Sequence, residues 1–134
     1  MILGLGCDIV NISRFDKDIK FLSRFSKKYL TDIERLELAR KIKSDDSKAL
    51  QMALATRFAA KEAVSKALGS GFRHGITLKD IEIVHDNLGK PLINLYNKAL
   101  ARAYLVSDNQ DFKMHITLSN EREYVNAVVV MEAL

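Results

Sequence analysis

Cysteine is almost absent from this sequence, since only Cys7 occurs among its 134 residues. A single cysteine excludes an internal disulfide, which fits a reducing compartment. Cys7 lies in an apolar run without an activating neighbour, so we expect a buried structural thiol rather than a nucleophile. Long apolar runs are also absent, because no stretch could span a bilayer and no charged segment leads an apolar one at the N-terminus. We therefore expect a soluble, cytoplasmic protein with no membrane partner.

Linkers, low-complexity segments and strong internal repeats are missing as well. The length of 134 residues, with 48% hydrophobic and 28% charged residues, suits a single folded domain over residues 1–134. The formal net charge of +4 favours an acidic partner but does not identify it. Nucleic acid, an anionic membrane, an acidic protein and a polyphosphate ligand are all compatible with that charge.

Hydrophobic periodicity and turn residues predict an α+β fold. Helices are expected at residues 12–18, 21–29, 32–42, 47–68 and 97–106. Strands are expected at residues 1–10, 81–85, 92–95, 112–118 and 124–131. The pattern Thr31-Asp32-Ile33-Glu34 is typical of a capping box at a helix start. We expect the first strand to be buried, the final strand to be central, and one antiparallel sheet to hold the last three strands.

Residues 47–68 predict the longest helix, because no glycine or proline interrupts them. Gly69 and Gly71 then end it, since glycine takes a positive φ without steric cost. One face is expected to be buried by Ala60, Ala63, Val64, Ala67 and Leu68. Glu62 and Lys66 lie one turn apart on another face, with Lys61 and Ser65 beside them. Taken alone, Glu62 and Lys66 could be a solvated pair worth about 0.3–0.5 kcal/mol.

Two carboxylates, Asp8 and Glu62, would meet if the first strand packed beside the long helix. Asp8 could instead cap the segment that follows it, although Asn11 or Ser13 could do this too. Paired carboxylates usually need a cation, and oxygen-only ligation favours Mg²⁺, which completes its shell with waters and phosphates.

Positive charge for such phosphates would come from Lys61, Lys66 and the backbone N–H groups of Gly69–Gly71. The lysines must outweigh the helix C-terminal dipole, which repels an anion at that loop. The residues alone therefore indicate a Mg²⁺ site that handles a phosphate ester.

Several motifs resemble those of the holo-[acyl-carrier-protein] synthases, the small class of 4′-phosphopantetheinyl transferases. The first is Gly4-Leu5-Gly6-Cys7-Asp8-Ile9-Val10 with Arg14, and the second runs from Arg57-Phe58-Ala59-Ala60-Lys61-Glu62-Ala63 through Lys66-Ala67-Leu68-Gly69-Ser70-Gly71. The later ones are Gly89-Lys90-Pro91 and His115-Ile116-Thr117-Leu118-Ser119, followed by Tyr124. The resemblance covers nearly the whole chain. One position departs, because many relatives carry a histidine where this chain has Asn120.

The resemblance implies a fold with an antiparallel sheet, a long central helix and several short helices. It implies transfer of the 4′-phosphopantetheine arm of coenzyme A to a serine of apo acyl carrier protein. Asp8 and Glu62 would hold Mg²⁺, and Glu62, Asp8 and Lys66 would be the catalytic residues. The serine proton would go to Glu62 or to a metal-held water. Coenzyme A would contact Lys61, Lys66, Gly69, Ser70, Gly71, Lys90 and Pro91.

The resemblance also implies a homotrimer with active sites between subunits, and an acidic carrier protein as partner. A docking surface is then expected at Arg14, Lys17, Lys20, Arg24, Lys27 and Lys28, since opposite charge speeds encounter. The alternative is a merely solvated basic face. Two other functions stay open at this point. One is a nucleic-acid-binding module, which would need aromatic side chains placed for stacking. The other is an inactive relative that binds carrier protein, which Asn120 weakly favours.

Overall fold

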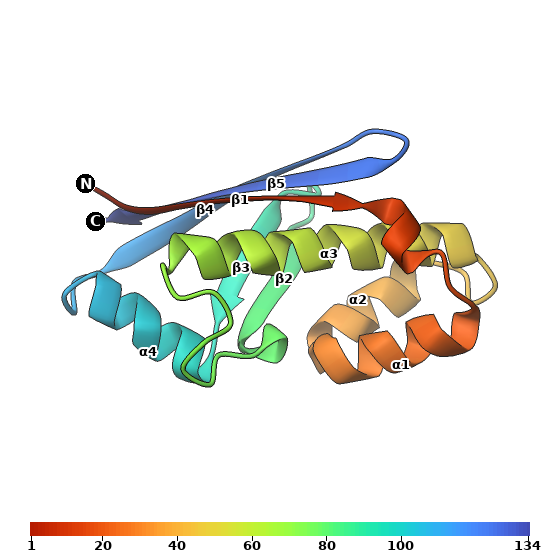
Figure 1. The fold of residues 1–134 in the computed structure, drawn as a ribbon, viewed down its shortest axis with the longest axis horizontal. Helices are drawn as coiled ribbons and strands as arrows, with labels where there is room; N and C mark the ends of the chain where they lie inside the picture. Colours follow the sequence, from red (N-terminus) through yellow and green to blue (C-terminus); the bar gives the residue numbers. More distant parts are fainter.

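The long helix α3, Ser47–Ala67, runs through the middle of the molecule and touches most other elements (Figure 1). The computed structural model describes all residues 1–134. The other helices are α1 (Ile19–Tyr29), α2 (Asp32–Lys41) and α4 (Asn97–Val106), with short 3-10 turns η1 (Ile12–Phe15) and η2 (Leu78–Asp80). The strands are β1 (Ile2–Asn11), β2 (Ile81–His85), β3 (Pro91–Leu95), β4 (Phe112–Asn120) and β5 (Tyr124–Ala133). No helix combines the length and hydropathy that a membrane span requires.

The strands are divided between two antiparallel sheets. Strand β5 is central in a three-stranded sheet of order β1-β5-β4, as its apolar sequence predicts, while β2 and β3 form a separate hairpin. The expectation that the last three strands form one sheet is therefore wrong. Strand β3 pairs with β2 across the turn at Asp86–Lys90, because closing so short a loop costs little entropy. The third strand of the larger sheet is β1, which lies at its edge beside β5.

Helix α3 covers only one face of the larger sheet, which lies above it in Figure 1. On β5, the alternate residues Val125, Ala127, Val129 and Met131 are all buried against the helix. The helix meets them with the face that the sequence predicts, since Ala60, Ala63, Val64, Ala67 and Leu68 are buried. Small alanine side chains allow the helix axis and the sheet to lie close together.

Strand β1 is an edge strand, and only one of its faces is buried. Gly6 and Val10 are buried, whereas Leu5 and Ile9 are 66% and 64% exposed. Cys7 points to the same outer face and is exposed. The expectations of a buried first strand and a buried thiol are both wrong in the single chain. The strand is apolar on both faces, and an apolar run of this kind does not show whether both faces are covered.

Local signals placed the helix ends correctly. Thr31 and Glu34 form the capping box at the start of α2, with N–H···O distances of 3.0 and 3.2 Å. Gly69 follows α3 with a φ of +72°, a conformation that favours glycine.

Candidate active site

Strand β1 crosses α3 at two glycines. A Cβ on Gly4 would lie 1.9 Å from the carbonyl oxygen of Ala67, and a Cβ on Gly6 would lie 1.8 Å from that of Ala63. Neither position can hold a side chain while the strand stays in place, because the obstructing atoms are helix backbone. Asp8 comes two residues after Gly6, so its side chain leaves the strand on the same, helix-facing side.

Asp8 meets Lys66 where the strand passes over the helix. The Lys66 Nζ donates to Asp8 Oδ1 at 3.1 Å and to the carbonyl oxygen of Cys7 at 2.8 Å. The Asp8 side chain is 17% exposed, and that of Lys66 is 51% exposed. The first strand therefore does pack beside the long helix, which is the condition under which Asp8 and Glu62 were expected to meet. Lys66 binds the strand rather than forming only a solvated pair within its own helix.

Glu62 lies next to this pair and is half-buried. Burial raises the pKa of its carboxyl group, and the charge of Asp8 raises it further, while Lys66 and Arg14 act in the opposite direction. The two negative charges thus repel each other, which is the electrostatic setting in which a cation is stabilised. No group of three or more His, Cys, Asp or Glu side chains in the chain is arranged so that it could hold a metal ion. An ion held here would have these carboxylates as its protein ligands, which suits Mg²⁺ with waters and phosphate oxygens in its remaining positions.

Arg14 also belongs to this neighbourhood, although sequence reasoning assigned it to carrier docking alone. Its guanidinium group lies over the ring of Phe58, 5.1 Å from the centroid, and its charge lowers the pKa of Glu62. Arg14 sits in η1, the turn that directly follows β1. The charge of this residue therefore acts on Glu62, and its position borders the basic surface of α1.

Lys61 is not at this site, and the prediction that it contacts a phosphate is wrong. Its side chain is 1% exposed, and its Nζ donates to Glu34 Oε1 at 2.7 Å. The carbonyl oxygens of Tyr29 and Leu78 each accept from the same nitrogen at 2.9 Å. Burial lowers the pKa of Lys61, whereas Glu34 raises it. All three donors of the ammonium group are used inside the protein.

The helix rotates by about 100° per residue, and this separates Lys61 from Glu62. Lys61 and Ser65, expected beside Glu62 and Lys66, are both buried, and the Ser65 hydroxyl donates to the carbonyl oxygen of Glu62 at 2.7 Å. Glu62 and Lys66 remain on the side that faces β1.

A buried ionic network fixes the opposite side of α3. Glu34 accepts from Lys61 and from the backbone N–H of Ile83, and Arg57 donates to Glu37 Oε1 at 3.0 Å. The network joins α2, α3 and β2 and so limits rotation of the helix that carries Glu62. Sequence reasoning read Glu34 only as part of a capping box. Its buried lysine partner is 27 positions away, which no local pattern indicates.

The polar groups of the loop after α3 are mostly hydrogen-bonded to the last turn of the helix or within the loop itself. The N–H groups of Gly69 and Gly71 donate to the carbonyl oxygens of Lys66 and Ser65 at 2.9 and 3.1 Å. Ser70 is buried, and its hydroxyl donates to the carbonyl oxygen of Gly71 at 3.0 Å. The two glycine N–H groups expected to receive a phosphate are therefore already paired.

The remaining predicted residues lie elsewhere on the chain. Lys90 is exposed in the β2–β3 turn, and Pro91 begins β3 opposite His85. Gly89 of the same turn lines a pocket that also includes Arg40 and Tyr96. The predicted docking residues are all exposed on η1, α1 and the short connection between them: Arg14, Lys17, Lys20, Arg24, Lys27 and Lys28.

Comparison with known proteins identifies the family of the chain. A family model described as the 4′-phosphopantetheinyl transferase superfamily matches residues 4–129. The chain belongs to this superfamily. It is a transferase, and its resemblance to the holo-[acyl-carrier-protein] synthases is confirmed along nearly its whole length.

Individual relatives cover the whole chain. The holo-[acyl-carrier-protein] synthase of Vibrio cholerae is 43% identical over 133 residues, which cover 98% of each chain. The acyl carrier protein synthase of Plasmodium yoelii with ADP bound is 34% identical, with a TM-score of 0.84 over 98% of this chain and 95% of that one. The Bacillus anthracis enzyme in complex with CoA (3′,5′-ADP) is 33% identical, with a TM-score of 0.76 over 100% and 99% of the two chains. The predicted α+β fold is thereby confirmed.

Proposed function

We propose that this transferase moves the 4′-phosphopantetheine group of coenzyme A to a serine hydroxyl of apo acyl carrier protein. The observation that carries the proposal is the meeting of Asp8, Glu62 and Lys66 where β1 crosses α3. The names of the relatives, and the coenzyme A complex of one of them, support the same reaction. Membership of a transferase family favours an enzyme over a nucleic-acid-binding module.

In this reaction the serine oxygen forms a bond to the β-phosphorus of coenzyme A. The bond from that phosphorus to the bridging oxygen breaks, and adenosine 3′,5′-bisphosphate leaves. The half-exposed Lys66 ammonium would contact the diphosphate while still held by the Cys7 carbonyl oxygen. The serine proton passes to Glu62 or to a water held by the carboxylates. The raised pKa of Glu62 supports this residue as the general base, because a base whose pKa is nearer to neutral accepts a proton more readily.

Asp8 and Glu62 would hold Mg²⁺. The donor set fits this ion, because it consists of two mutually repelling carboxylates without nitrogen or sulfur ligands. When bound, the ion neutralises charge on the diphosphate oxygens. The nucleotide is proposed to lie toward Gly69–Gly71 and the turn with Lys90 and Pro91. The pocket beside that turn, with Arg40 and Tyr96, supports this direction.

The active enzyme is proposed to be a homotrimer with its sites between subunits. Two observations support association. The outer face of the larger sheet exposes Leu5 and Ile9, and an uncovered apolar face of this kind marks a contact surface. Asp8, Glu62 and Lys66 line none of the main pockets of the single chain, so a neighbouring copy would have to close the site.

The acidic carrier protein is proposed to dock on the exposed cations of η1 and α1, with Arg14 and Arg24 as its principal contacts. Arg14 also faces Glu62, so docking there would bring the acceptor serine toward the carboxylates. A reducing cytoplasm is the proposed location, since the one cysteine is an exposed free thiol.

Mass spectrometry of apo acyl carrier protein tests the proposal. Incubation with coenzyme A, Mg²⁺ and the enzyme should add about 340 Da, the mass of the phosphopantetheine moiety. Asp8→Asn and Glu62→Gln should each slow the reaction by about a hundredfold or more. Carrier protein that binds but gains no mass would identify an inactive relative. Binding to oligonucleotides that falls steeply with salt, without affinity for coenzyme A, would support the nucleic-acid alternative.

A further inference from the structure

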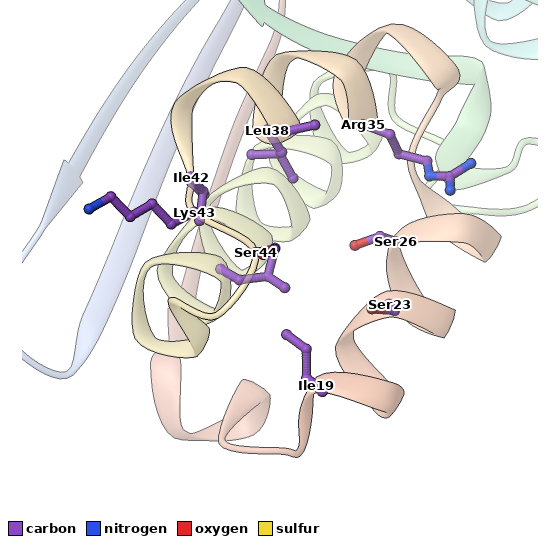
Figure 2. A pocket seen from close by; sticks show the side chains of 10 residues that line it. Ile19, Ser23, Ser26, Arg35, Leu38, Ile42, Lys43 and Ser44 are labelled. Carbon is purple, nitrogen blue, oxygen red and sulfur yellow. The ribbon is translucent and has the colours of Figure 1, made fainter.

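A cleft between α1 and α2 has no part in the proposed reaction (Figure 2). Its volume of about 580 Å³ falls within the range typical of small-molecule sites, roughly 300–1,000 Å³. Its floor and walls come from α1, α2, the loop after α2 and the start of α3. It shares no residue with the Asp8–Glu62 site. The lining consists of Ile19, Ser23, Ser26, Arg35, Leu38, Ala39, Ile42, Lys43, Ser44 and Leu50.

The cleft is open because its facing positions carry small side chains. Helix α1 presents Ser23 and Ser26 to it, and α2 presents Ala39. A closely packed helix pair would place large apolar side chains there, with each ridge filling the opposite groove. Leu38 forms a buried apolar floor, and Ile42 and Leu50 beside it are half-buried.

The chemistry of the lining has two parts. Ile19, Leu38, Ile42 and Leu50 give it apolar surface. Its polar lining residues are three serines, Arg35 and Lys43, whose ammonium group points away from the cleft in Figure 2, and no carboxylate lines it. The three hydroxyls form no hydrogen bond within the chain.

Arg35 supplies a cation that is available to a ligand. Its only ionic partner is Asp32, at 3.7 Å, and the Asp32 side chain is 97% exposed, so that pair is weak. Figure 2 shows Arg35 and Ser26 toward one end of the cleft, while Ile42 and Lys43 lie toward another. The Leu38 side chain stands between these two ends.

We propose that this cleft binds a linear alkyl chain with one anionic headgroup, the chemistry of a fatty acid. The headgroup would accept hydrogen bonds from the Arg35 guanidinium and the Ser26 hydroxyl. The alkyl chain would lie along Leu38 and Ile42 and exclude water from them. The charge of the lining selects this ligand class, because a cationic or zwitterionic amphiphile would find no carboxylate partner there.

Isothermal titration calorimetry with dodecanoate, below its micelle concentration, tests the proposal without any turnover. We expect saturable binding of one molecule per chain. Decanoate, which is two methylenes shorter, should bind roughly fifteenfold more weakly, since each buried methylene changes affinity about fourfold. Dodecanol, which lacks the charge, should also bind about tenfold more weakly. Absence of saturable binding, or equal affinity for dodecanoate and dodecanol, would overturn the proposal.

Variants locate the binding. Ala39→Leu fills the cleft from α2 and keeps a strong helix former, so it should abolish binding, and Ser23→Leu offers the same test from α1. Arg35→Gln should weaken dodecanoate about tenfold while leaving dodecanol unchanged. Arg73→Gln removes an exposed arginine outside the cleft and should change neither affinity. Unchanged binding in a folded Ala39→Leu variant contradicts the proposal. A raised KM for the carrier protein in that variant, with no dodecanoate binding to the wild type, would instead assign the cleft to a partner side chain.

Discussion

Gly6 lies so close to Ala63 that a Cβ on the glycine would stand 1.8 Å from the alanine carbonyl oxygen. This contact seats β1 directly on α3. Asp8, two residues further along the strand, therefore reaches Lys66 of the helix at 3.1 Å. The geometry of the candidate site depends on the absence of a side chain at position 6.

Gly6→Ala should displace β1 from the helix. We expect it to lower the free energy of unfolding by about 1–3 kcal/mol, the usual cost of overpacking, and to impair transfer strongly. Urea unfolding and the mass-spectrometric assay measure the two effects. Lys79→Ala, an exposed position in η2, should change stability by less than about 0.5 kcal/mol. If Gly6→Ala and Lys79→Ala have equal effects on stability and on transfer, β1 does not pack against α3 as described.

Glu62→Gln should slow transfer by about a hundredfold or more and yet stabilise the fold near neutral pH. The pKa of Glu62 is raised in the folded protein, first by burial and then by Asp8, so ionising it costs folding free energy. That cost is absent below the unfolded pKa of about 4.3 and appears as the pH rises through the folded pKa. Thermal unfolding without metal should show a higher Tm for the variant at neutral pH and no gain at about pH 4. A lower Tm at neutral pH would contradict this assignment.

Lys61→Met should be strongly destabilising, because it leaves Glu34 as a buried charge without its cation. We expect a loss of about 3–5 kcal/mol by denaturant unfolding, partly recovered when Glu34→Gln is added. Lys66→Met is the matched control, because Lys66 is half-exposed and its loss should cost at most about 1 kcal/mol while impairing transfer. A stable Lys61→Met protein with weakened coenzyme A affinity would restore the phosphate role first expected for Lys61.

Helices and caps could be predicted because their signals are local. The capping box at Thr31 and Glu34 and the stop at Gly69 each depend on residues within one turn of the helix end. The placement of Lys61 could not be predicted, because the sequence does not show which side of α3 faces α2. The pairing of β1 with β5 joins residues more than 100 positions apart, so the larger sheet was not predictable either.

The Asp8–Glu62 site could be predicted only in part. Two carboxylates could be identified from residue type, but their approach depends on the glycines at positions 4 and 6 facing alanine backbone. The two-residue spacing of those glycines, together with alanines four residues apart on the helix, is the sequence signal for this close crossing.

Ile9→Glu should disrupt the proposed trimer. A carboxylate on the outer face of the sheet cannot be buried against a neighbouring copy without a large desolvation cost. Light scattering after size exclusion should give the mass of a trimer for the wild type and of a monomer for the variant. Leu105→Glu, at a similarly exposed apolar position on α4, should stay trimeric. A wild-type monomer with full activity would contradict the proposed assembly.

Binding of Mn²⁺, as a paramagnetic substitute for Mg²⁺, tests the joint role of Asp8 and Glu62 most directly. Electron paramagnetic resonance with adenosine 3′,5′-bisphosphate present should detect one tightly bound ion per chain in the wild type. Asp8→Asn and Glu62→Gln should each weaken that binding by about tenfold or more. Binding of the ion with unchanged affinity in both variants would contradict the proposed metal site.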